Sequence, residues 1–130
     1  MDEARRNGVD PAVAGIVRVA DYIAAVNDFD EDRIVATFAD DAVVNDARRE
    51  FWGAAEIRKW VIKEFLDDHV TMDVTEVIGH HAMTVVRARY DGEYDKANLP
   101  EELILTNYFH IEDCRIVTLM IIHNEPTPAA

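Results

Sequence analysis

The first quarter of the chain has the apolar spacing of a helix. Apolar residues recur at intervals of three and four, the period of an α-helix, in two adjacent stripes. The first stripe comprises Val13, Ile16, Val17, Ala20, Ile23 and Ala24, and the second comprises Gly15, Val19, Tyr22 and Val26. The positions left for solvent are Arg18, Asp21 and Ala25. An apolar face this wide predicts a helix that lies against a concave surface.

Two further helices are predicted before the middle of the chain. Either Asp28 or Asp30 can cap a short second helix, because an aspartate side chain can accept a hydrogen bond from a free N–H group of the first turn. A third helix is predicted to follow Gly53. The residues expected to face inward are Ile34, Val35 and Phe38 around the second helix, and Ile57, Trp60, Val61 and Phe65 in the third.

The second half of the chain has the two-residue alternation of β-strands. Long strands are predicted at residues 70–78, 82–90, 103–111 and 115–124, and a short one at 42–46 between the second and third helices. Helices followed by a run of strands predict an α+β fold, with the helices packed on one face of an antiparallel sheet. We predict one domain over residues 11–125, with flexible tails at residues 1–10 and 126–130.

Composition and charge narrow the class of protein. The chain has 130 residues, of which 49% are hydrophobic, enough for one folded domain with a core. Asp and Glu number 26 against 13 Lys and Arg, so the formal charge is −13. That charge argues against nucleic acid and against an anionic membrane surface as partners. The start, MDEARRNG, lacks the apolar stretch of a signal peptide, so we expect a cytoplasmic protein.

The sequence offers no obvious metal or cofactor site. Cys114 is the single cysteine, and His80 and His81 are adjacent, so in a strand they would face opposite ways. With His110 expected on the outer face, no cluster of three histidines forms. There is also no Gly-rich phosphate loop and no dinucleotide fingerprint. We therefore predict neither a metal nor a cofactor.

Three segments carry a resemblance to a known family. They are Phe38-Ala39-Asp40-Asp41-Ala42-Val43-Val44-Asn45-Asp46, then Gly53 followed by Ile57 and Trp60, and Thr106-Asn107-Tyr108-Phe109-His110-Ile111 followed by Arg115-Ile116. The chain resembles the SnoaL-like branch of the nuclear-transport-factor-2-like superfamily from about Val13 to Glu125. That branch is related to ketosteroid isomerases, polyketide cyclases and scytalone dehydratase. The resemblance implies a cone-shaped curved sheet wrapped around the long first helix, with an apolar pocket between them.

The resemblance also implies candidate catalytic residues. Tyr22 matches the oxyanion-hole tyrosine of the isomerases, and Asp46 matches their catalytic base. Asn107 falls where the isomerases have a protonated aspartate; an asparagine cannot titrate, but its NH₂ group can still donate a hydrogen bond. The expected function is that of an enzyme that removes a proton next to a carbonyl of a small apolar cyclic substrate. Isomerisation, cyclisation and dehydration all share this step.

Further residues are expected to line the substrate pocket. By resemblance, His123 occupies a position where isomerases place a pocket aromatic. Pairing of the last two strands puts His123 about opposite Leu103, roughly 13 Å along the sheet from Asn107. A loop at residues 95–102 is a candidate cover for the pocket mouth. The residues that we expect to bind substrate are His123, Trp52, Trp60, Tyr90, Phe109 and Leu119.

Each of these assignments has a structural alternative. Asp46 could cap a strand end or pair with Arg48 or Arg49, and Tyr22 could be a satisfied core tyrosine. His123 could likewise be a core histidine with its hydrogen bonds satisfied, and Asn107 could lack a catalytic role. The whole domain could instead be a non-catalytic module for an apolar ligand, or an interaction domain. Its predicted outer sheet face is apolar enough to predict a homodimer. The residues of that face are Val85, Ile104, Tyr108, Met120 and Ile122.

Overall fold

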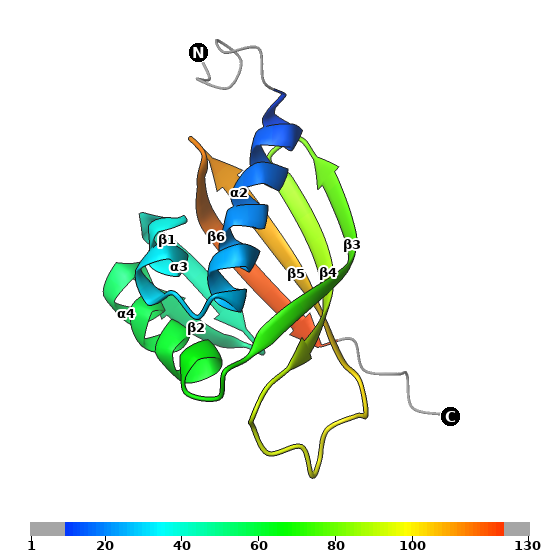
Figure 1. The fold of residues 1–130 in the computed structure, drawn as a ribbon. Coiled ribbons are helices and arrows are strands. Elements are labelled where there is room, and N and C mark those ends of the chain that lie inside the picture. The colour runs from blue at the N-terminus through cyan, green and yellow to red at the C-terminus, as the bar shows by residue number, and fades with distance from the viewer. Residues whose placement is uncertain (1–9, 124–130) are drawn as a thin grey trace.

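The structure is a computed structural model, and it describes residues 10–123 (Figure 1). Residues 1–9 of the predicted N-terminal tail (1–10) and the whole predicted C-terminal tail (126–130) lie outside the described residues. The helices are α2 (Pro11–Asn27), α3 (Glu31–Ala36) and α4 (Gly53–Val61), and α4 continues as a π-helical turn, η1 (Ile62–Leu66). The strands are β1 (Phe38–Asp46), β2 (Arg49–Trp52), β3 (Thr71–His80), β4 (Met83–Asp91), β5 (Leu103–Glu112) and β6 (Arg115–His123). No helix in the described part of the chain is long and apolar enough to cross a membrane.

The six strands form one curved sheet, and the predicted α+β architecture is confirmed. Their order is β2-β1-β6-β5-β4-β3, and Figure 1 shows α2 lying across the concave side of the sheet. One neighbouring pair, β1 and β6, is parallel, so the sheet is mixed and not wholly antiparallel as predicted. The alternation of side chains predicts strands but does not determine which strand lies beside which. A parallel pair needs a long crossover connection, and most of the domain forms it here.

The two apolar stripes of α2 have different environments. The second stripe faces the sheet, and Val19, Tyr22 and Val26 are buried. The first stripe lies mostly outward, and Val17 is 56% exposed. Ala25, predicted to face solvent, is buried instead. Periodicity could not choose between two apolar stripes, because the choice depends on which side of the helix the sheet covers.

Close packing at Gly15 fixes this orientation of α2. A Cβ atom at Gly15 would lie 2.9 Å from Oγ1 of Thr84 on β4, closer than real Cβ contacts. Asp10 caps the N-terminus of α2, because its side chain accepts a hydrogen bond from the N–H group of Ala12 at 2.7 Å. Residue 10, predicted in the tail, therefore belongs to the folded domain. Asp30 caps α3 in the same way, as one of the two predicted alternatives.

The turn between β5 and β6 changes the predicted register. Asp113 and Cys114 both have positive φ angles, 50° and 60°, as in a two-residue hairpin turn. The ladder then shifts between His110 and Ile111, so Ile116 enters the core in place of Val117. As a result His123 pairs with Leu105 and not with Leu103. It therefore lies two residues from the partner of Asn107, about 7 Å along the sheet.

Candidate functional site

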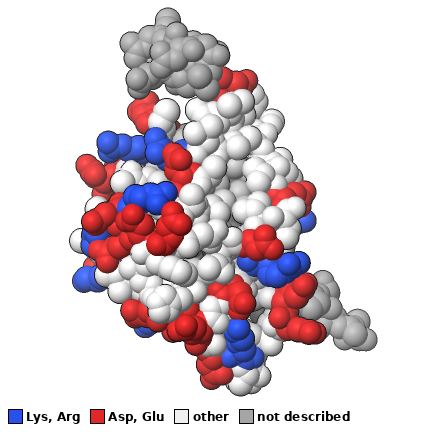
Figure 2. Space-filling model, viewed as in Figure 1, with Lys and Arg blue, Asp and Glu red and all other residues white. Residues whose placement is uncertain are grey.

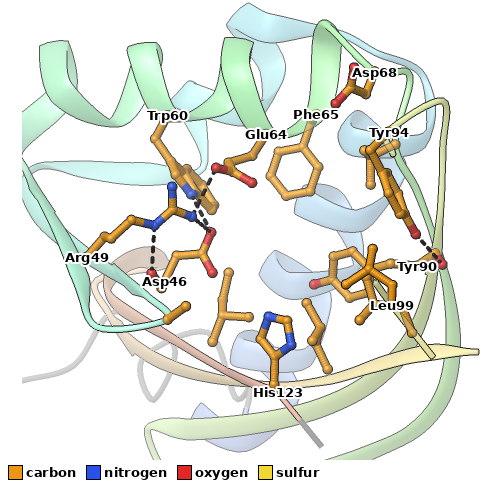
Figure 3. Close-up of a pocket in the computed structure, with 15 residues that line it drawn as sticks. Asp46, Arg49, Trp60, Glu64, Phe65, Asp68, Tyr90, Tyr94, Leu99 and His123 are labelled. Atoms are coloured by element: carbon orange, nitrogen blue, oxygen red, sulfur yellow. Dashed lines mark hydrogen bonds and ion pairs between the residues drawn. The ribbon is translucent and has the colours of Figure 1, made fainter. Parts of the chain in front are cut away.

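A cavity of about 220 Å³ opens at one end of the concave interior, beside α4 and η1 (Figure 3). Its wall comes from the end of β1, from α4 and η1, from β4 to β6, and from the segment between β4 and β5. The wall is largely apolar, with a group of charged side chains on the α4 side. The residues that line the cavity include Asp46, Arg49, Trp60, Glu64, Phe65, Asp68, Tyr90, Tyr94, Leu99 and His123.

Asp46, the predicted base, lies on the cavity wall at the end of β1 and is only 7% exposed. One carboxylate oxygen, Oδ2, accepts hydrogen bonds from Nε1 of Trp60 at 3.0 Å and from Nη2 of Arg49 at 3.1 Å. The other oxygen, Oδ1, accepts no hydrogen bond from the described residues, and Figure 3 shows it directed into the cavity. A fixed carboxylate with one oxygen free toward a cavity can accept a proton there.

A tight turn places Arg49 beside Asp46. Ala47 and Arg48 both have positive φ angles, 52° and 71°, and Asp46 pairs directly with Arg49 across the turn. The side chain of Asn45 supports the turn by accepting a hydrogen bond from the N–H group of Arg48 at 3.1 Å. This two-residue turn without glycine creates strand β2, which the sequence did not predict.

Glu64 shares Arg49 with Asp46. The same Nη2 atom of Arg49 lies 3.0 Å from Oε1 of Glu64, so one guanidinium bridges two carboxylates. Glu64 follows Trp60 by four residues, and the helical path from α4 into η1 places both beside the cavity. Among residues 10–123, no three His, Cys, Asp or Glu side chains are grouped so as to hold a metal ion.

Tyr90 and Asn107 form a neutral pair deeper in the interior. The hydroxyl of Tyr90 donates to Oδ1 of Asn107 at 3.0 Å, and Nδ2 of Asn107 donates to the carbonyl of Val86 at 3.5 Å. Tyr90 lines the cavity, whereas Asn107 is fully buried behind it. Burial raises the pKa of Tyr90, the hydrogen bond to Asn107 opposes that rise, and the charge of Asp46 adds to it. Tyr90 therefore stays protonated at neutral pH and remains a hydrogen-bond donor.

Tyr22 is enclosed in the core and does not line the cavity. Its ring makes edge contacts with Phe38, Phe65 and Phe109, with centroids 5.4–6.4 Å away. Its hydroxyl is buried and has no hydrogen-bond partner among the described residues. Burial raises the pKa of Tyr22 well above its ordinary value, and Tyr90 and Asp46 raise it further. The hydroxyl is therefore neutral, and an unpaired donor of this kind is costly to bury.

The predicted binding residues divide into two groups. Trp60, Tyr90 and His123 line the cavity. Phe109 and Leu119 do not, because both are fully buried in the core between the sheet and α2. Trp52 does not line it either: it is 63% exposed on the edge strand β2, where its Nε1 donates to Glu50. These positions contradict the prediction that Phe109, Leu119 and Trp52 line the substrate pocket.

Several lining residues were not expected from the sequence. The sequence predicts Arg49 only as an alternative partner of Asp46 and gives no prediction for Glu64 or Asp68. The spacing of Glu64 from Trp60 was the available signal, since residues four apart share a helix face. Tyr94 and Leu99 come from the segment between β4 and β5, and Leu99 belongs to the loop at residues 95–102 that is a candidate cover.

Comparison with known proteins places these features in a family. Among solved structures, a protein provisionally described as a polyketide cyclase from Sinorhizobium meliloti is similar, with a TM-score of 0.73 and 28% identity. The match covers 81% of this chain and 93% of that one. A provisionally described ketosteroid isomerase from Kribbella flavida has a TM-score of 0.75 at 13% identity, covering 90% of this chain and 82% of that one.

A third structure, an NTF2-like protein of unknown function from Cytophaga hutchinsonii, has a TM-score of 0.71 at 11% identity. It covers 85% of this chain and 89% of that one. At such low identities the second and third matches show the fold alone. No curated protein matches the sequence. The sequence profile of the SnoaL-like domain matches residues 19–119, most of the chain and nearly all of the sheet. The chain therefore belongs to the SnoaL-like domain family.

Proposed function

We propose that this protein is a cofactor-independent enzyme that removes a proton next to the carbonyl group of a small, largely apolar cyclic substrate. The observation that carries the proposal is the position of Asp46. Its Oδ1 is open to a mainly apolar cavity, while its Oδ2 is fixed by Trp60 and Arg49. A carboxylate held in this way can act as a general base, and isomerisation, cyclisation or dehydration can follow the same first step.

Tyr90 is the better candidate for stabilising the enolate oxygen that forms. Tyr22 and Asn107 were expected in this role, but neither lies on the cavity wall, whereas the Tyr90 ring does. Its hydroxyl now donates to Asn107. Rotation of that O–H group toward a substrate oxyanion would exchange a neutral hydrogen bond for a stronger, charge-assisted one. In this scheme Asn107 holds the hydroxyl of Tyr90 in position, and Tyr22 is a packing residue of the core.

A non-catalytic module for an apolar ligand is the second candidate. It would require the same cavity but no reachable base. The open Oδ1 of Asp46 favours the enzyme over this module. A pure interaction domain is less favoured, because Trp60 stands at the cavity wall while Trp52 and Phe109 lie away from it, so these aromatic residues do not fill the cavity.

Turnover of a carbonyl substrate panel tests the proposal. A 3-oxo-Δ5-steroid and polyketide substrates would be assayed with wild type and Asp46→Asn, and we expect the variant to lose about 100- to 10,000-fold in rate. Asp41→Asn is the matched control, since Asp41 lies on the same strand but is exposed. It should keep wild-type turnover. Equal rates for wild type and Asp46→Asn would remove Asp46 as the base.

We also propose that the outer face of the sheet pairs with a second copy of the chain. Met120 and Ile122 on β6 are 41% and 45% exposed there, and three half-buried apolar residues lie on the same face, namely Val85, Ile104 and Tyr108. We expect a dimer in sedimentation velocity at micromolar concentration, and a monomer after Ile122→Glu. A monomeric wild-type protein would refute this pairing.

A further inference from the structure

The cavity carries a negative charge that proton abstraction by Asp46 does not require. Three carboxylates line it, from Asp46, Glu64 and Asp68, against the single guanidinium of Arg49. Because one nitrogen of Arg49 bridges Asp46 and Glu64, those three groups together leave one negative charge. Asp68 adds a second. By formal charge, which counts histidine as neutral, the wall has two negative charges in excess and would repel an anionic ligand.

Asp68 contributes a carboxylate without a partner. It is half-buried, and its side chain makes no ion pair or hydrogen bond with any residue from 10 to 123. Its backbone carbonyl accepts a hydrogen bond from the N–H group of Glu93 at 2.7 Å, which ties the segment carrying Tyr94 to this side of the cavity. Figure 3 shows Glu64 and Asp68 on the same side as Phe65, with Tyr94 next to Asp68.

Aromatic rings line the same cavity as these carboxylates. They belong to Trp60, Phe65, Tyr90 and Tyr94. The face of an aromatic ring attracts a cation, and the attraction grows when water is excluded. Tyr94 already has one cation near it, because Nζ of Lys96 lies 5.6 Å from its ring centroid. Lys96 does not line the cavity, and it is paired with Asp91 at 2.7 Å. It therefore does not neutralise the excess negative charge of the cavity wall.

We propose that the ligand of this cavity carries a cationic nitrogen, as a protonated or quaternary amine. The ammonium group would lie near Glu64 and Asp68 and the rings of Phe65 and Tyr94, with its apolar body toward Leu99 and His123. Only the carbonyl end, which would reach Asp46, rests on the proposed function. The formal charge of −13 supports the same choice, because the field of an acidic protein draws cations toward it. Figure 2 shows acidic side chains gathered at the lower end of the molecule.

Three small probes of nearly the same shape test the charge preference. They are choline, the neutral 3,3-dimethylbutan-1-ol, and the anion 3,3-dimethylbutanoate, each titrated into the full chain while the indole N–H signal of Trp60 is followed by NMR. We expect choline to bind about tenfold more tightly than the alcohol, and the anion to bind most weakly. An alcohol that binds as tightly as choline, a tighter anion, or no choline-dependent shift at Trp60 would each overturn the proposal.

Two substitutions test whether the carboxylates of the cavity wall cause the preference for choline. Glu64→Gln and Asp68→Asn should each weaken choline binding by roughly three- to tenfold while alcohol binding stays within about twofold. Asp67→Asn is the matched control, because Asp67 is an exposed neighbour that does not line the cavity. It should leave both affinities unchanged. Retained alcohol binding also demonstrates that a variant is folded, and a choline affinity unchanged in both wall variants would overturn the assignment.

The outcomes separate this inference from the proposed function. Turnover that depends on Asp46 without a preference for choline would contradict the cationic ligand alone. A preference for choline without turnover on any carbonyl substrate would contradict the enzyme alone, since the binding measurement requires no chemistry.

Discussion

Two groups of polar side chains lie at the cavity and behind it, and they differ in charge and in burial. Asp46, Arg49 and Glu64 form an ion-paired group on the cavity wall, where the side chain of Arg49 is 51% exposed. Tyr90 and Asn107 are neutral, and Asn107 is sealed behind the wall. Ions are expensive to bury without solvent or a partner, whereas neutral groups need only a hydrogen bond. The proposed proton transfer therefore belongs to the charged group, and the neutral pair provides the hydroxyl of Tyr90 that we propose as donor to the enolate oxygen, held in place by Asn107.

The largest expected contrast between the two regions is in packing. Phe109→Ala at the sealed end removes a fully buried ring in contact with Tyr22. It should lower the free energy of unfolding by about 3–5 kcal/mol, measured by urea titration. Leu99→Ala at the open cavity is the comparison, and it should cost less than about 1.5 kcal/mol because Leu99 is only half-buried. Similar losses for both would show that the cavity end is as tightly packed as the core.

Alkaline pH should destabilise the protein through its sealed hydroxyls. The pKa values of Tyr22 and Tyr90 are raised in the folded state, chiefly by burial. Above pH 10 the unfolded chain loses protons that the folded state keeps, so stability falls as pH rises. Well above pH 10 the slope should approach about 1.4 kcal/mol per pH unit for each tyrosine, and twice that for both. Urea unfolding at pH 9 to 11 measures it.

Substitution by phenylalanine is the control for this slope. Tyr22→Phe and Tyr90→Phe should each remove about half of the contribution of the two buried hydroxyls, and the double variant should keep only a smaller slope from Tyr94 and Lys96, whose pKa values are also raised. Tyr108→Phe, on the outer sheet face, provides the control that retains both sealed hydroxyls. A slope in the double variant as steep as that of wild type would contradict the prediction, because the titrating groups would then be residues other than Tyr22 and Tyr90.

The sealed pair should behave as a coupled unit. Asn107→Leu leaves the hydroxyl of Tyr90 without its acceptor, which should cost about 1–3 kcal/mol of folding stability. Adding Tyr90→Phe should recover part of that loss, because both polar groups are then gone. A double-mutant cycle from urea unfolding measures the coupling. Additive losses would mean that the 3.0 Å hydrogen bond does not connect the two residues energetically.

The smallest effect is expected at Trp52. Its side chain is exposed on β2 and bonds only to Glu50 in the described structure. Trp52→Ala should change stability by less than about 0.5 kcal/mol and leave ligand binding in the cavity unchanged. Calorimetry of the variant with choline checks the second point. A clear loss of affinity would place Trp52 at the site after all.

The strands and helices could be predicted because each has a local signature. The alternation from residue 82 to residue 90 corresponds to β4, where Thr84, Val86 and Ala88 are buried. Strand β2 could not be predicted in the same way, since its turn uses Ala47 and Arg48 in left-handed conformations that carry no glycine signal. The position of Arg49 beside Asp46 depends on that turn.

The candidate site could be predicted only in part. The resemblance identified Asp46, and the structure places it on the cavity. It also identified Tyr22 and Asn107, but whether a buried polar residue reaches a cavity depends on side chains in front of it. Tyr90 stands between Asn107 and the cavity, and no spacing along the chain encodes that order. The position of His123 changed through two local features, the two-residue turn at Asp113 and Cys114 and the shift of the ladder between His110 and Ile111.

By itself, the sequence determined the α+β class, the family and the acidic surface, because periodicity, motifs and charge are properties of local segments. The tertiary structure decided which stripe of α2 is buried, which polar groups are sealed, and which carboxylates share Arg49. Those outcomes depend on contacts between residues far apart in the chain, because the packing and the desolvation of each side chain are determined by all the neighbours that the fold brings to it. The proposed chemistry therefore rests on Asp46 as the sequence identified it, in surroundings that only the folded sheet assembled.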